Sequence, residues 1–113
     1  MKKRNYCRFF KELYWGDSVK KHSLVKWRLK NGRIQPSIYC IQKAFADSDQ
    51  LDIMHCAFLK QPFYRDNPAY IYGIAGSYNE ALELVVRISD EAARNGYEGR
   101  VRDYLDYLDY LES

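Results

Sequence analysis

The sequence lacks the features that place a chain in a familiar functional class. No apolar run approaches the roughly 18 residues needed to cross a membrane. The basic start of the chain is followed by no sustained apolar segment and no small-residue cleavage site, so no signal peptide is indicated. Neither of the common phosphate-binding motifs, G-x-G-x-x-G and G-x-x-x-x-G-K-[ST], occurs. We therefore predict a cytoplasmic protein with no membrane partner, no cofactor and no small-molecule ligand.

Cysteine and histidine are also scarce. The three cysteines, Cys7, Cys40 and Cys56, are odd in number and form no C-x-x-C pair, which argues against a disulfide framework or a zinc ribbon. If a hairpin turns about Ser48, Cys40 faces Cys56 while His55 points to the other side of the sheet, which is too few ligands for zinc. Neither histidine belongs to a nucleophile motif. We predict buried packing cysteines, no metal site and no catalytic residue, although a site assembled from distant positions stays open.

Charge is divided unevenly along the chain. The length of 113 residues, with 47% apolar and 29% charged residues, predicts one globular domain over residues 1–113. The residues up to Ile34 contain eleven Lys and Arg and two acids, whereas those from Gln35 onward contain seven Lys and Arg and thirteen acids. Either the basic third is a surface for nucleic acid or acidic lipid, or it is solvated or neutralised by packing beside the acidic C-terminus. The candidate nucleic-acid or anion contacts are Lys20, Lys21, Lys26, Arg28, Lys30 and Arg33, with Trp27 as a stacking residue.

The N-terminal third predicts one helix and one ambiguous segment. Apolar residues at i, i+3, i+4 and i+7 indicate an amphipathic helix over residues 3–14. These residues are Tyr6, Phe9, Phe10 and Leu13. Residues 18–31 fit either a helix that ends before Gly32 or a strand in which apolar and basic residues alternate before an Asn-Gly turn.

The middle of the chain predicts three strands. Residues 37–45 and 51–59 are rich in β-forming residues and flank a polar turn at 46–50, which indicates an antiparallel hairpin. Residues 69–76 predict a third strand after the connection at 60–68. This connection contains aromatic residues beside basic ones, a mixture found both in recognition loops and in loops that fold back over a small sheet. Its aromatic residues are Phe63 and Tyr64.

The helix over residues 78–95 has the clearest boundaries. The sequence from Ser77 to Glu80 matches the S-x-x-E capping box, in which each side chain accepts a hydrogen bond from the other residue's backbone N–H. Leu82 and Val86 widen its apolar stripe, so we expect the helix to lie against the sheet. The glycines before it would also suit an anion site at Ser77, but the Glu80 carboxylate occupies the position that a phosphate would take. We favour the cap and keep the anion site as the alternative.

The C-terminal repeat DYLDYLDYLES predicts a short amphipathic helix. At about 100° per residue its leucines fall within one sector and its tyrosines flank them. This face either closes the protein's own core or docks on a partner or second copy. Its candidate interaction residues are Tyr104, Leu105, Tyr107, Leu108, Tyr110 and Leu111.

The stretches QLDIMHCAFL, QPFYR and GIAGSYNEALELV, between Leu51 and Val86, resemble a group of short uncharacterised bacterial proteins that share a strand, a connection, a strand and a helix. The resemblance covers about half of the chain. It implies no assigned chemistry, so no functional residue is carried over, but it implies that the ambiguous segment before Asn31 is helical. The predicted fold is α+β: a three-stranded antiparallel meander with one or two N-terminal helices, one long helix packed on the sheet and a C-terminal amphipathic helix.

The functional prediction follows from these surfaces. The first hypothesis is a non-catalytic protein-interaction or self-associating module, which the eleven tyrosines favour because tyrosine is enriched at interfaces. The alternative is a nucleic-acid-binding protein that uses the basic N-terminal third.

Overall fold

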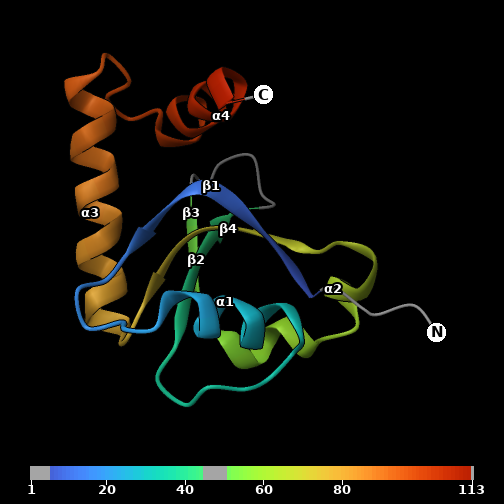
Figure 1. Cartoon of the computed structure of the whole chain (residues 1–113). Coiled ribbons are helices and arrows are strands. Elements are labelled where there is room, and N and C mark those ends of the chain that lie inside the picture. The colour runs from blue at the N-terminus through green and yellow to red at the C-terminus, as the bar shows by residue number, and fades with distance from the viewer. Residues whose placement is uncertain (1–5, 45–50, 113) are drawn as a thin grey trace.

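The computed structural model describes residues 6–44 and 51–112, and it shows an α+β fold around a mixed four-stranded sheet (Figure 1). The strand order is β1-β4-β2-β3, in which β1 runs parallel to β4 and the other neighbours are antiparallel. The predicted turn at 46–50 lies outside the described residues. The elements are β1 Cys7–Trp15, α1 His22–Lys30, β2 Tyr39–Lys43, β3 Leu51–His55, the 3₁₀ helix η1 Cys56–Lys60, α2 Phe63–Asp66, β4 Ala69–Ala75, α3 Tyr78–Arg94 and α4 Val101–Glu112.

The segment predicted as a helix over residues 3–14 is instead the strand β1. Its aromatic residues suit a strand as well as a helix, and pairing with β4 decides between them. The register shifts between Phe9 and Tyr14, and Phe9 and Phe10 pack on opposite sides of the sheet. Both faces of β1 are covered, so ordinary strand alternation buries adjacent apolar residues, and these suggested helical spacing.

The three later strands do not form the predicted meander. β2 lies between β3 and β4, because the chain crosses through η1 and α2 before it returns as β4. The hairpin register also differs from the prediction by two residues, so that Cys40 faces Met54 and not Cys56. The strand predicted over residues 51–59 ends at His55, where η1 begins.

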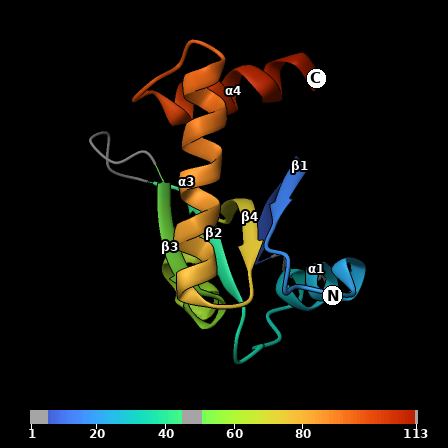
Figure 2. The same cartoon turned by 90° about the vertical axis from the view of Figure 1, so that its left-hand side faces the viewer.

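Helices cover both faces of the sheet (Figure 2). One apolar cluster joins α1, η1 and α2 to the sheet, and a second joins α3 and α4 to the other face. β4 lies between the two clusters, and its Ile71 and Tyr72 are completely buried. A Cβ atom at Gly73 would lie 3.1 Å from Leu84 Cδ2 and 3.3 Å from the Tyr14 carbonyl oxygen, so glycine lets α3 and β1 approach β4 closely.

The helices settle two sequence predictions. The ambiguous segment is the helix α1, which buries only Val25 and Leu29 and ends before Gly32 at φ +69°. The long helix is confirmed as α3, with Ser77 as its N-cap. In the part of the chain that the structure describes, no helix is long and apolar enough to cross a membrane.

Candidate functional site

The predicted C-terminal interaction face is divided between the core and the surface. Leu105 is completely buried and Tyr104 nearly so, and Leu108 packs against the same cluster. The exposed members are Tyr107, Tyr110 and Leu111. The first turns of α4 therefore close the protein's own core, and only its outer side is available to a partner.

Tyrosine hydroxyls form hydrogen bonds that join α4 and β1 to the rest of the fold. Tyr104 and Tyr14 donate to the same Glu91 oxygen at 2.7 and 2.6 Å, and Tyr70 donates to the Asp109 carboxylate at 2.7 Å. Burial, with the hydrogen bond to Glu91, raises the pKa of Tyr104 to about 12. The hydroxyls of these three tyrosines are therefore bonded within the fold.

The open edge of the sheet is β3. Cys56 N–H donates to the Ile38 carbonyl, and this fixes which residues of the hairpin exchange hydrogen bonds. With the observed register, Asp52 and Met54 point their backbone groups at β2, whereas Ile53 points its N–H and C=O away from the sheet. Among the described residues, no strand pairs with this side of β3 and no hydrogen bond reaches the Ile53 backbone.

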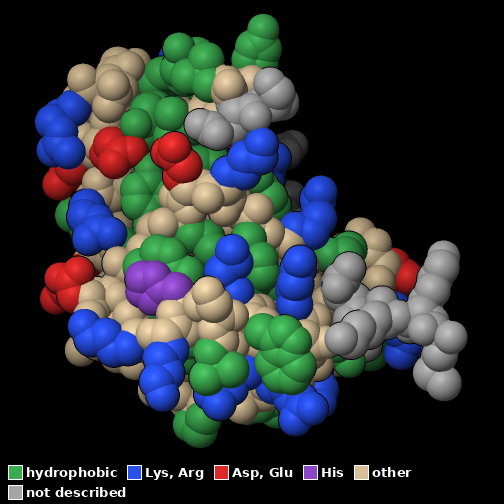
Figure 3. Space-filling model, viewed as in Figure 1, with side chains coloured by type: hydrophobic (Ala, Val, Ile, Leu, Met, Phe, Trp, Pro, Cys, Tyr) green, Lys and Arg blue, Asp and Glu red, His purple; other side chains and the backbone are tan. Residues whose placement is uncertain are grey.

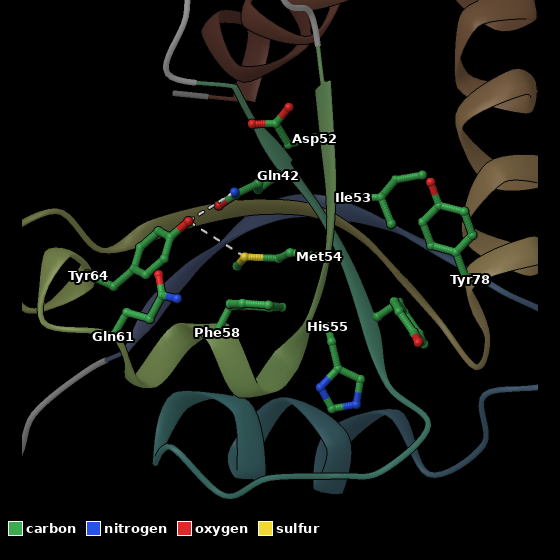
Figure 4. A pocket seen from close by; sticks show the side chains of 10 residues that line it. Gln42, Asp52, Ile53, Met54, His55, Phe58, Gln61, Tyr64 and Tyr78 are labelled. Atoms are coloured by element: carbon green, nitrogen blue, oxygen red, sulfur yellow. Dashed lines mark hydrogen bonds between the residues drawn. The ribbon is translucent and has the colours of Figure 1, made fainter.

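A groove of about 530 Å³ follows this edge on both sides of the strand (Figure 4). On one side Met54 lies between Phe58 of η1 and Tyr64 of α2; on the other, Ile53 faces Tyr78 of α3. Further lining residues are Tyr39, Gln42, Asp52, His55 and Gln61. Of the predicted loop pair, Tyr64 is buried and lines the groove, whereas Phe63 is 49% exposed beside it.

Gln42 places an unpaired acceptor at the groove. Its side chain is 4% exposed, and its Nε2 donates to the Tyr64 hydroxyl at 3.1 Å, which in turn contacts Met54 Sδ at 3.6 Å. Gln42 Oε1 is buried and has no hydrogen-bond partner among the described residues. A buried acceptor left unpaired costs about 1–3 kcal/mol, which a donor from a ligand would offset.

Helix α3 turns an apolar flank toward β3. Ala81, Leu84, Ile88 and Ala92 face the sheet, and at 100° per residue one flank carries Tyr78, Leu82 and Val86. The helix packs against the sheet as expected, but these three side chains are 51%, 43% and 58% exposed, so Leu82 and Val86 do not widen its buried face. Tyr78 lines the groove, which places this flank on the side of β3.

The opposite flank of α3 is polar and meets the end of β1. Arg87 donates to the Trp15 carbonyl at 3.3 Å, and Glu91 accepts from Tyr14. Glu80 accepts from the Ser18 N–H at 3.1 Å and the Ser18 hydroxyl at 2.8 Å. This flank therefore closes the β1 side of the fold.

The predicted capping box is half present. Ser77 Oγ accepts from the Glu80 N–H at 3.1 Å, but the Glu80 carboxylate accepts from the Gly76 N–H at 2.6 Å and not from Ser77. Burial raises the pKa of Glu80, but hydrogen bonds from Gly76 and Ser18 outweigh it, and the pKa lies below its usual value. The carboxylate therefore occupies the Gly76 N–H, one residue before the predicted anion site at Ser77.

The cysteines and histidines have structural contacts. All three cysteines are buried, as predicted, and burial raises the pKa of Cys7 to about 12, so this thiol is a poor nucleophile. His55 Nδ1 accepts from the Ala57 N–H, and Nε2 lies 2.8 Å from the Pro36 carbonyl. No cluster of three or more His, Cys, Asp or Glu within residues 6–44 and 51–112 is placed to hold a metal ion.

The six predicted basic contacts come together on α1 and the segments beside it. All six side chains are exposed, and α1 lies on the opposite sheet face from α4. The ion pairs between described residues are Lys43–Asp106 and Arg100–Asp103, neither of which involves α1. The acidic C-terminal helix therefore does not neutralise this basic surface.

Sequence reasoning missed the groove. Strand order depends on long-range pairing, so no local sequence pattern marks β3 as an edge strand. For the same reason no local pattern marks Gln42 as a residue that lines the groove. The one available signal was the extra apolar stripe of Leu82 and Val86.

No protein-family model, no curated protein and no solved structure matches the chain. The resemblance to short bacterial proteins stays a prediction.

Proposed function

We propose that the protein is a non-catalytic cytoplasmic interaction module that binds an extended segment of a partner protein along β3. The segment adds a fifth strand to the sheet, and its backbone pairs with the outward N–H and C=O of Ile53. The observation that carries this proposal is an unpaired strand edge bordered by a groove whose lining comes from both faces of the sheet.

The groove supports recognition of side chains as well as backbone. Alternate side chains of an added strand point to opposite faces of the sheet. On one face they meet Met54, Phe58 and Tyr64, and on the other they meet Ile53 and Tyr78. Apolar residues on both faces of the added strand are therefore the expected ligand pattern.

The hydrogen-bond acceptors at the groove indicate which kind of partner binds there. Gln42 Oε1 and the Asp52 carboxylate offer acceptors on the same face, which favours a partner side chain with N–H donors, such as Lys or Arg. A second copy docked through its own β3, with the sequence LDIMH, would bring another Asp52 and no Lys or Arg. We therefore assign the edge to a segment of another protein.

Selection from a phage-displayed library of random linear peptides tests the proposal. We expect enriched peptides with apolar residues on both faces of the strand and a basic residue. N-methylation of the selected peptide's backbone should abolish binding at every second residue and spare the residues between, because only alternate N–H groups of an edge strand face its neighbour.

Two variants of one position provide the matched control. Ile53→Pro removes the backbone N–H that points away from β2, without removing a hydrogen bond to β2. Ile53→Ala also removes the isoleucine side chain but keeps this N–H. We expect Ile53→Ala to bind the selected peptide and Ile53→Pro not to bind. The proposal fails if no peptide is enriched, if both variants bind equally, or if the protein forms a dimer that protects the Ile53 amide.

A further inference from the structure

The face formed by α1 and the residues after it carries charge that the rest of the fold leaves uncompensated. Residues 18–35 contain six Lys and Arg and no Asp or Glu. None of the six forms an ion pair with a carboxylate among the described residues. Figure 3 shows basic side chains gathered over this part of the molecule, while the acidic side chains lie mainly elsewhere on the same view. A surface of this kind attracts a polyanion.

A hollow of about 440 Å³ lies within this basic surface. Its apolar part consists of Leu24, Trp27 and Ile34, which are 38%, 48% and 56% exposed. Arg28 and Arg33 also line it. The Arg33 guanidinium lies 5.6 Å from the centre of the Trp27 ring, which orients the indole by a cation–π contact.

We infer that this hollow binds single-stranded nucleic acid, independently of the β3 groove. A base, which is flat and apolar on its faces, stacks on Trp27 or Ile34, and the adjoining phosphates meet Arg28 and Arg33. Lys21, Lys26 and Lys30 extend the positive surface beyond the hollow. Lys20 is left out of the contact set, because its ammonium donates to the Asp17 carbonyl.

The shape of the site favours a nucleic acid over a lipid surface. The apolar side chains line a concavity together with arginines, which suits a base between phosphates. Membrane-surface binding instead requires a convex apolar face that enters the headgroup layer. Duplex RNA or DNA presents stacked bases that cannot reach Trp27, so single strands are the expected form.

The test measures fluorescence anisotropy of labelled oligouridylate and oligothymidylate with the whole chain at about 50 mM salt, and then at increasing salt. Trp27→Ala should weaken binding about 5- to 100-fold, which corresponds to the loss of one stacked base. Arg28→Gln combined with Arg33→Gln should make the slope of log K against log salt shallower by about 1.4, as expected for two lost contacts to a single strand.

A matched control removes the same charge elsewhere. Arg94→Gln combined with Arg100→Gln changes two exposed arginines, one at the C-terminal end of α3 and one just before α4, and it should leave binding unchanged. Thermal melts of each variant show whether it is folded. The inference is wrong if the folded protein binds neither oligonucleotide, if the control weakens binding as much as the α1 variants, or if duplex or phosphatidylserine vesicles bind better than single strands.

Discussion

The two edge strands of the sheet are treated differently by the rest of the chain. β1 carries the exposed charges Arg8, Lys11 and Glu12 and an irregular register, and the polar flank of α3 is bonded to its end. β3 is short and regular, and it borders a groove with apolar side chains on both faces of the sheet. Natural proteins protect sheet edges because an open edge recruits other strands. This contrast is the reason why we propose β3, and not β1, as the edge that receives a partner strand.

A substitution in the core beneath α4 should have the largest effect on the free energy of unfolding. Leu105 is completely buried between α4 and the sheet, so Leu105→Ala should lower the free energy of unfolding by about 2–5 kcal/mol. Leu111→Ala, on the exposed side of the same helix, should change it by less than about 0.5 kcal/mol. Urea denaturation of both variants measures the difference. Equal losses of unfolding free energy would show that α4 does not cover this face of the sheet.

Removing the hydrogen bonds that join α3 to β1 should have an intermediate effect on the free energy of unfolding. Glu91→Ala removes the acceptor shared by Tyr14 and Tyr104, and leaving their hydroxyls unpaired should cost about 1–3 kcal/mol. The cost should be smaller in a Tyr14→Phe, Tyr104→Phe background, because no hydroxyl then remains to be paired. A double-mutant cycle by urea denaturation gives this coupling, and additive losses would contradict the shared bond.

The Glu80 carboxylate should make the stability of the fold sensitive to acid. Its folded pKa is lowered, so its contribution to stability is complete above the unfolded pKa of about 4.3 and is lost as the pH falls through the folded pKa. Glu80→Gln should therefore flatten the decline of the unfolding free energy below about pH 5. Denaturation curves at several pH values measure this slope. An unchanged slope would show that the bonds to Gly76 and Ser18 do not favour the charged form.

Changes at the open edge should have the smallest effect on stability. Leu82→Ser combined with Val86→Ser alters exposed side chains, so the free energy of unfolding should change by less than about 1 kcal/mol. Binding of a peptide selected on β3 should nevertheless weaken. Tyr110→Ser combined with Leu111→Ser, which removes similarly exposed side chains from α4, should leave that binding intact. Equal weakening by the two pairs would mean that α3 does not border the site.

The sequence predicted the features that depend on neighbouring residues. Ser77 and Glu80 marked the start of α3, and the Asn95-Gly96 pair marked its end. The helical class of α1 came from the resemblance and not from its weak apolar pattern, since only Val25 and Leu29 are buried.

Features that depend on distant pairing were missed. Phe9 and Phe10 fit a helix or a bulged strand equally well, and only β4 distinguishes the two. The hairpin register is two residues from the predicted one, with Cys40 opposite Met54, and Cys56 opens η1 instead of continuing the strand. The role of β3 as an open edge follows from the position of β4 beyond β2, which no local pattern encodes.

Amide hydrogen exchange along β3, resolved by NMR, tests the open edge most directly. The N–H groups of Met54 and Cys56 point at β2 and should exchange slowly, whereas that of Ile53 points away and should exchange quickly in the free protein. A bound peptide should slow the Ile53 amide and change the others little. If Ile53 is as protected as Met54 in the free monomer, the edge is already covered and the proposed site is wrong.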